Sequence, residues 1–265
     1  GIIKITSLYL LWENMMFNRK LYKQTAKKQL AGRRTVPVLA TLITTFILLF
    51  LGTSSEIHTS QIINSNSAYA QTASWIYETE DDFADDYAFS VSTISDSGVS
   101  LLFSILTISI TGILILAQCH LYNEYFKTLE KISFAEYLRG FTHWFKGALA
   151  GLWFTLWVVL WSFLFFIPGI VKAFSYSQMF FVLAENPKIG VAKAMQISKT
   201  LTKGFKADLF VMYISFFGWH FLSTFTFGIL QLWIQPYEYM SFTNAYKSLK
   251  MHALRTGILT ESDFI

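Results

Sequence analysis

The chain carries an asymmetric charge pattern around its first apolar run. Thr53 to Ser97 is a stretch of 45 residues that holds eight acidic residues and no Lys or Arg. The run before it, Pro37 to Gly52, has no charge, and Asn18 to Arg34 holds seven basic residues and no acidic one. Basic residues collect on the cytoplasmic side of membrane helices. The pattern therefore predicts a spanning helix between a basic cytoplasmic segment, residues 1–34, and an acidic external loop, residues 53–97.

The composition indicates an environment of lipid rather than water. Of the 265 residues, 53% are hydrophobic and only 14% are charged, whereas soluble domains are about 25% charged. The net charge of +4 resembles that of a nucleic-acid binder, but the basic residues are grouped beside apolar runs, where they contact anionic headgroups. We therefore expect no nucleic-acid partner. A single cysteine, Cys119, excludes an intramolecular disulfide and a multi-cysteine metal site.

Six apolar runs have about the length that a membrane crossing requires, which is about 20 helical residues. The predicted spans are residues 36–52, 98–120, 148–167, 170–184, 207–225 and 229–245. The third and fourth are separated only by Pro168-Gly169, so we expect a hairpin there, and the alternative is one long kinked helix. Two crossings return the five lysines of residues 185–206 to the cytoplasm, whereas one would leave them outside.

The remaining breaks and termini complete the predicted topology. Gly228 separates the fifth span from the sixth, and Pro236 would kink the sixth. The expected fold is an all-α polytopic transmembrane helical bundle over residues 35–250, followed by a tail, residues 251–265, with both termini cytoplasmic. Residues 1–15 contain no run long enough to span. They either precede a native start at Met15 or Met16 or form an interfacial helix.

One cytoplasmic segment has the 3.6-residue period of an amphipathic helix. One side of a helical wheel between Val191 and Leu201 carries Val191, Ala194, Met195, Ser198 and Leu201. Lys193, Lys199 and Lys203 fall on the other side. We expect a helix lying in the membrane interface whose lysines contact anionic lipids of the cytoplasmic leaflet. A solvated linker is the alternative.

The sequence carries no recognised catalytic signature. It lacks the zinc-binding His-Glu-x-x-His helix, the Gly-x-Ser-x-Gly elbow and the phosphate-binding P-loop. The acidic residues from Glu78 to Asp86 lack the alternating spacing and the glycine of a calcium loop. We therefore expect no enzyme, no cofactor and no metal site. His220, inside the fifth predicted span, is the candidate polar site in the membrane interior, either for a proton or ligand or as a histidine bonded to a neighbouring helix.

Several short motifs bear a resemblance to a known family. They are Ala26-Lys27 with Leu30 and Gly32, Ile167-Pro168-Gly169-Ile170, Tyr176-Ser177, Ala184-Glu185-Asn186-Pro187, Ala194, Ser198-Lys199, Lys203-Gly204, Phe210, Ser215-Phe216, Gly218-Trp219, Thr226-Phe227-Gly228 and Pro236-Tyr237. On these residues the chain resembles the DUF975 family of uncharacterised bacterial integral membrane proteins, most strongly over residues 167–237. The resemblance implies a protein of the bacterial inner membrane, and it supplies no activity or functional residue.

Two functions from different classes fit these observations. The first is a non-enzymatic membrane protein that binds lipids or a partner, either another protein or a second copy, at its basic cytoplasmic face. The alternative is a small transporter or transporter subunit with a midplane site near His220. Breaks in apolar helices near Pro168, Gly169, Gly228 and Pro236 favour the alternative, because discontinuous helices build midplane sites.

Overall fold

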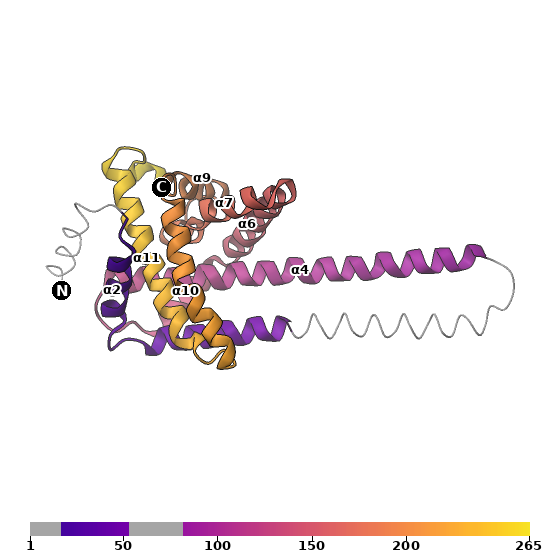
Figure 1. The fold of residues 1–265 in the computed structure, drawn as a ribbon, viewed down its shortest axis with the longest axis horizontal. Helices are drawn as coiled ribbons and strands as arrows, with labels where there is room; N and C mark the ends of the chain where they lie inside the picture. The colour runs from indigo at the N-terminus through magenta and orange to yellow at the C-terminus, as the bar shows by residue number, and fades with distance from the viewer. Residues whose placement is uncertain (1–16, 53–81) are drawn as a thin grey trace. The chain divides into compact units, whose positions relative to one another are not determined.

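A computed structural model of the protein describes residues 17–52 and 82–265, with side chains in the second range from residue 99 onward. Every regular element in these ranges is helical, which confirms the all-α expectation for them (Figure 1). The helices are α2 (Arg19–Leu30), the helix Thr35–Gly52, α4 (Asp82–Lys127), α5 (Phe134–Arg139), η1 (Gly140–His143), α6 (Trp144–Leu164), α7 (Phe166–Tyr176), α8 (Met179–Glu185), α9 (Val191–Leu201), α10 (Lys206–Phe225), α11 (Gln231–Arg255) and η2 (Glu261–Phe264).

The chain divides into two compact units. One is Thr45–Ile108, and the other, called the main unit below, combines Gly1–Thr44 with Ser109–Ile265. All the contacts discussed below lie within the main unit.

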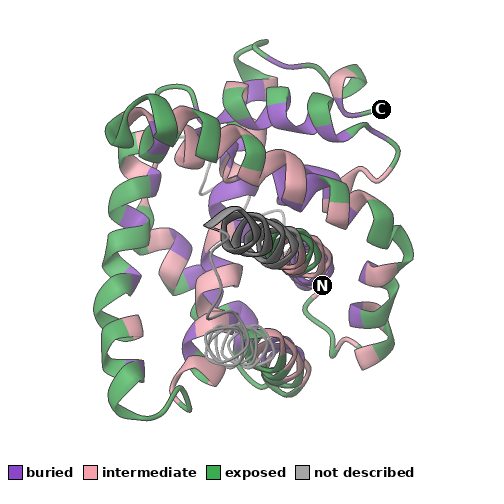
Figure 2. Cartoon of the chain, turned by 90° about the vertical axis from the view of Figure 1, so that its right-hand side faces the viewer, coloured by how far each residue is buried: buried purple, intermediate pink, exposed green. Residues whose placement is uncertain are grey.

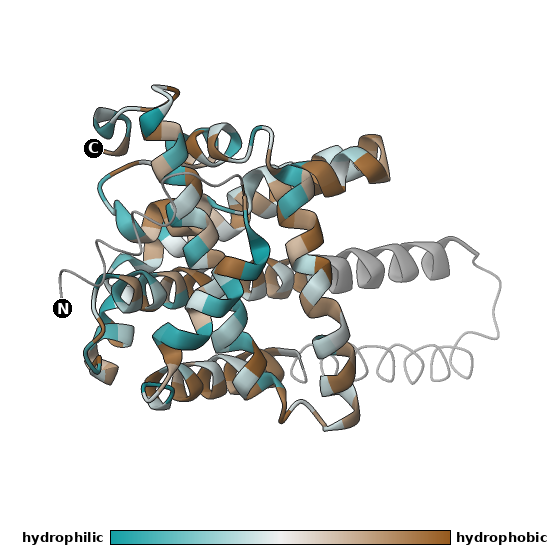
Figure 3. Cartoon of the chain, turned by 60° about the vertical axis from the view of Figure 1, so that its left-hand side comes forward, coloured by the Kyte–Doolittle hydropathy of each residue, from teal (hydrophilic) through white to brown (hydrophobic). Residues whose placement is uncertain are grey.

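Four helical stretches are long and apolar enough to cross a membrane. They are Thr35–Gly52, Val99–Lys127, Phe134–Leu164 and Phe166–Glu185. They overlap the first four predicted spans, although the third begins at Phe134 and not at residue 148. Many of their large apolar residues are exposed, among them Phe163 at 91%. Figure 2 shows exposed residues along the outer faces of the helices. Figure 3 shows hydrophobic residues along the outer surfaces of the helices. Exposed apolar surface on this scale is typical of contact with lipid.

The third and fourth stretches form two separate helices rather than one kinked helix, because α6 and α7 pack against each other. The break, however, falls at Phe165, whose backbone is extended (φ −158, ψ 139), and not at Pro168-Gly169. Pro168 lies in the first turn of α7, where a helix needs no backbone N–H from it. Gly169 provides close packing, since a Cβ there would come within 2.1 Å of the Ser162 Oγ.

The predicted acidic loop, residues 53–97, is shorter than expected. Its first part lies outside the described residues, but α4 already begins at Asp82. No proline interrupts α4, and the helix passes through Gly98 into the apolar run. The helix has 46 residues, more than twice the number that a membrane crossing needs.

Small residues bring α4 and α6 into backbone contact. A Cβ on Gly112 would lie 2.3 Å from the Gly147 carbonyl oxygen and 2.9 Å from the Gly151 Cα. Gly147 and Gly151 are four residues apart, so they share one face of α6. Such small residues let membrane helices approach closely and pack without bulky side chains. This crossing was not predicted from the sequence.

The fifth and sixth predicted spans correspond to α10 and α11, which are not among the four stretches. The turn between them includes Phe227 and Gly228, both with positive φ. The amphipathic helix α2 lies along α11, where Tyr22 donates to the Ser248 Oγ at 2.9 Å and Asn244 donates to the Tyr22 carbonyl at 3.2 Å. Figure 1 shows α10 and α11 running across the direction of residues 109–127 of α4, which belong to the same unit. The six-span count stays a prediction.

Candidate functional site

The α9 helix has the bounds and the two sides that its sequence predicts. Its buried residues are Val191, Ala194, Met195, Ile197, Ser198 and Leu201. Ser198 fixes this side, because its Oγ donates to the Ser175 carbonyl at 2.9 Å and accepts from the Gln178 N–H at 3.1 Å. The helix is followed by Gly204 with φ +90, a conformation that favours glycine.

Of the three lysines of the predicted lipid contact, Lys193 and Lys199 lie on the opposite, exposed side of α9, and Lys203 follows two residues after its end. Lys193, Lys199 and Lys203 are all exposed, and we call them the α9 lysines. Lys193 donates to the Ile265 carbonyl at 3.2 Å. No ion pair involves any of the three within the described ranges. No acidic side chain of the described residues therefore neutralises the three charges, while the placement of α9 in a membrane interface stays a prediction.

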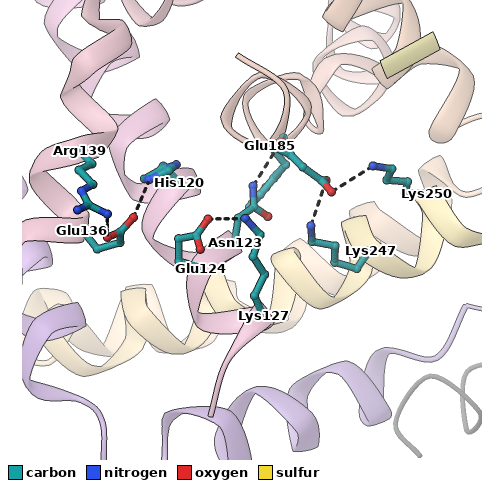
Figure 4. Close-up of polar contacts among 10 residues, drawn as sticks. His120, Asn123, Glu124, Lys127, Glu136, Arg139, Glu185, Lys247 and Lys250 are labelled. Atoms are coloured by element: carbon teal, nitrogen blue, oxygen red, sulfur yellow. Dashed lines mark hydrogen bonds and ion pairs between the residues drawn. The ribbon is translucent and has the colours of Figure 1, made fainter. Parts of the chain in front are cut away.

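A charged cluster joins the end of α8 to α11 (Figure 4). Glu185, at the end of α8, accepts from the Tyr246 hydroxyl at 2.6 Å. Its carboxylate also pairs with Lys247 at 3.0 Å and with Lys250 at 3.1 Å. Burial lowers the pKa of Lys247, and the Glu185 carboxylate opposes this by raising it. We call these four residues the Glu185 cluster, and its contacts fasten α8 to α11.

Contacts with α6 and α4 hold the same region of the chain. Lys146, in the first turn of α6, donates to the carbonyls of Pro187 and Ile189. Asn123 of α4 donates to the Phe181 carbonyl at 3.3 Å (Figure 4). The segment between α8 and α9 is thus fastened to α6, while α8 itself is fastened to α4 and α11.

His220 lies in a polar group shared by α10 and α11. Its Nε2 is 2.7 Å from the Glu238 Oε2, and its Nδ1 is 3.1 Å from the Gln231 Oε1. A protonated imidazole satisfies both oxygens as a donor. The ring is thus engaged by the neighbouring helix, as in one of the two expected readings of this residue. Lys23 of α2 lies close by, with its Nζ 2.6 Å from the Ser215 Oγ and 3.9 Å from the centre of the Phe216 ring.

Of the two remaining predicted helix breaks, one lies in a turn and the other lies inside a helix. Gly228 lies in the turn between α10 and α11 with φ +80. Pro236 lies inside α11, which continues through it. Pro236 is therefore not a helix end, and the preceding turn already contains bonds of the shorter 3₁₀ type, such as that from the Trp233 N–H to the Leu230 carbonyl at 3.1 Å.

Several polar residues of structural importance were not predicted. Gln118, inside the second span, donates to the Thr44 Oγ1 at 2.9 Å, and Thr44 lies 3.1 Å from the Tyr137 hydroxyl. The available signal was an uncharged polar residue within an apolar run, which usually faces other helices. Glu185 could have been noticed as the one acid in a segment with five lysines. Within the described residues, no group of three or more His, Cys, Asp or Glu side chains is placed to hold a metal ion.

Four apolar helices of spanning length with outward apolar surfaces define a helical, membrane-type protein. Residues 165–253 match the family described as "Protein of unknown function (DUF975)". This match confirms the resemblance over α7 to α11, the part that contains the Glu185 cluster and the α9 lysines. No curated protein and no solved structure matches the chain.

Proposed function

We propose that the chain is a multi-pass protein of the bacterial cytoplasmic membrane that binds anionic lipids at its cytoplasmic face and performs no chemical reaction. The observation that carries the proposal is the two-sided α9, with a fully packed apolar side, two exposed lysines on the other and a third just after its end. A helix of this kind lies naturally at the boundary between protein and headgroups. In a variant of this proposal, the same basic face binds a protein partner or a second copy of the chain. That partner would have to present an acidic surface in place of the lipid headgroups.

The first prediction tests the α9 lysines. We expect Lys193→Gln/Lys199→Gln/Lys203→Gln to weaken binding of phosphatidylglycerol to the purified protein at least tenfold, because each basic residue near a headgroup contributes about 1 kcal/mol. The affinity is measured by titrating lipid into the protein in a neutral detergent. Gln196→Ala/Thr200→Ala changes the same side of α9 without removing charge and should leave the affinity unchanged. Equal affinities for the lysine variant and the wild type would contradict the proposal.

The topology proposed with this function has four spans, with α10 and α11 lying along the cytoplasmic surface. The support comes from α2, whose Lys23 contacts Ser215 and Phe216 of α10 and whose Lys27 lies over the Tyr237 ring of α11. Charged side chains are costly in hydrocarbon, so helices that α2 covers fit the headgroup level better than the membrane interior. Four spans and the six predicted from the sequence both leave the two termini in the cytoplasm.

Thiol labelling distinguishes the four-span topology from the six-span topology. Phe227, in the turn between α10 and α11, is 97% exposed, and Cys119 is buried. In the four-span arrangement, an impermeant thiol reagent should label Phe227→Cys in inside-out vesicles and not in intact cells from which the wall has been removed. Thr256→Cys, in the tail, should behave in the same way under either count. Labelling of Phe227→Cys from outside would support six spans.

A transporter is the second candidate, and the His220 group is the observation that favours it. A histidine paired with Glu238 at 2.7 Å between α10 and α11 is a chemically suitable proton carrier. The proposal ranks below lipid binding because both ring nitrogens already have partners. The cavity described below is lined by Trp219 but not by His220.

A further inference from the structure

We propose that a pocket between α2, the helix Thr35–Gly52 and the α10–α11 hairpin binds the phosphate headgroup of one anionic phospholipid. The α2 pocket, as we call it, is separate from the α9 lysines. The inference rests on the proposed function only in that the ligand is an anionic lipid. It adds one specific binding site to a general affinity for an anionic membrane surface.

The α2 pocket combines two cations with three aromatic rings. It has a volume of about 220 Å³, and its wall includes Lys27, Arg34, Trp219, Trp233 and Tyr237. The Lys27 Nζ lies 5.5 Å from the centre of the Tyr237 ring. Within residues 17–52 and 99–265, neither Lys27 nor Arg34 forms an ion pair. Two positive charges therefore meet at one cavity without an acidic partner from the described part of the chain.

This combination selects for a phosphate rather than for other headgroup chemistry. The planar guanidinium of Arg34 matches two phosphate oxygens, and the ammonium of Lys27 adds a point charge. Aromatic rings alone favour quaternary ammonium groups such as choline. With two cations in the wall, however, a choline group would be repelled, so the pocket favours a headgroup with net negative charge.

The surroundings favour a lipid over a soluble anion. On one side, Leu39 and Leu42 of the helix Thr35–Gly52 are about half exposed, and on the other side Ile229 is 61% exposed. These apolar side chains neighbour Val38 and Leu230, which line the pocket. The volume is below the range of about 300–1,000 Å³ for pockets that enclose a whole drug-sized ligand. A headgroup fits inside, while acyl chains would lie along the apolar rim.

The α2 pocket and the α9 lysines lie toward opposite ends of α10. The α9 helix leads into the first turn of α10, whereas Trp219 and Leu230 lie toward the turn that joins α10 to α11 (Figure 1). Substitutions at the two places can therefore be compared without disturbing a shared contact.

Native mass spectrometry of the full-length protein in a neutral detergent tests the inference. Titrated with phosphatidylglycerol or with phosphatidylcholine of the same acyl chains, the wild type should retain one phosphatidylglycerol at concentrations where phosphatidylcholine is not retained. Lys27→Gln/Arg34→Gln should need about 25-fold more phosphatidylglycerol for the same occupancy, because each of the two charges contributes about fivefold. Lys27→Arg should keep the lipid, and millimolar inorganic phosphate should not displace it.

The controls separate this site from the α9 lysines and from misfolding. Lys199→Gln/Lys203→Gln should keep the first lipid and weaken only the binding of further phosphatidylglycerol molecules. Trp233→Ala, which removes an apolar wall at an exposed position, should weaken the first lipid without abolishing the preference for charge. All variants should keep the melting temperature of the wild type. A lipid retained by Lys27→Gln/Arg34→Gln but lost from the α9 variant would overturn the inference and leave the proposed function standing. Displacement by inorganic phosphate would assign the pocket to a soluble anion instead, and retention of the first lipid by both variants would overturn the inference alone.

Discussion

Glu185→Gln is expected to destabilise the protein by about 3 kcal/mol. The substitution removes the only acid of the Glu185 cluster and leaves Lys247, which is 9% exposed, without its counter-ion. Breaking a buried ion pair by removing one partner costs about 3–5 kcal/mol, and we take the low end because the Glu185 side chain is 19% exposed. The free energy of unfolding, measured in mixed micelles with increasing denaturing detergent, gives the result.

The pH dependence of this variant identifies the cause. Burial lowers the pKa of Lys247 in the folded protein, and Glu185 opposes that shift, so its removal should lower the pKa further. Between the lowered folded pKa and the usual value near 10.5, the unfolded state binds more protons than the folded state. Stability of Glu185→Gln should therefore rise with pH across that window, more steeply than in the wild type.

Glu130→Gln is the matched control for this experiment. Glu130 is exposed, and its side chain makes no ion pair among the described residues. Surface substitutions of this kind change stability by about 0.5 kcal/mol or less. If Glu185→Gln were as stable as Glu130→Gln at neutral pH, the cluster would not be what fastens α8 to α11.

Local periodicity explains why α9 could be predicted from the sequence. The alternation of apolar and basic residues between Val191 and Leu201 needs no information from the rest of the chain, and the structure has the same bounds and the same buried side. The positions of the first four apolar stretches follow in the same way from length and hydropathy. Length and hydropathy do not determine whether α10 and α11 cross the membrane, because that depends on whether the basic helix α2 covers them.

The contacts that join distant segments could not be predicted from local patterns. Glu185 meets Lys247 and Lys250 across more than 60 positions of sequence, and nothing in a single sequence pairs them. The hairpin was expected at Pro168-Gly169 because these residues break helices in general. In the structure, α6 ends at Leu164 before them, and the first turn of α7 accommodates the proline at no cost in hydrogen bonds.

The glycine contact between α4 and α6 leads to the second large effect. Gly112→Ala should destabilise the protein by about 3 kcal/mol or prevent its folding, since the new Cβ would meet the Gly147 carbonyl oxygen at 2.3 Å. Overpacking costs about 1–3 kcal/mol, occasionally more, and here the obstructing atoms are backbone, which cannot move aside as a flexible side chain can. The helices would have to separate, which loses the close packing that membrane helices depend on.

Gly218→Ala makes the same chemical change in α10 and supplies the control. A Cβ on Gly218 meets nothing within 4 Å, and alanine is favoured over glycine inside a helix by about 1 kcal/mol. Its stability should equal or exceed that of the wild type, so the two substitutions have opposite expected signs. The same unfolding measurement, together with the yield of monodisperse protein on size-exclusion chromatography, compares them. If Gly112→Ala were as stable as Gly218→Ala, α4 and α6 could not be in backbone contact at Gly112, and another interface would have to hold the second and third apolar stretches together.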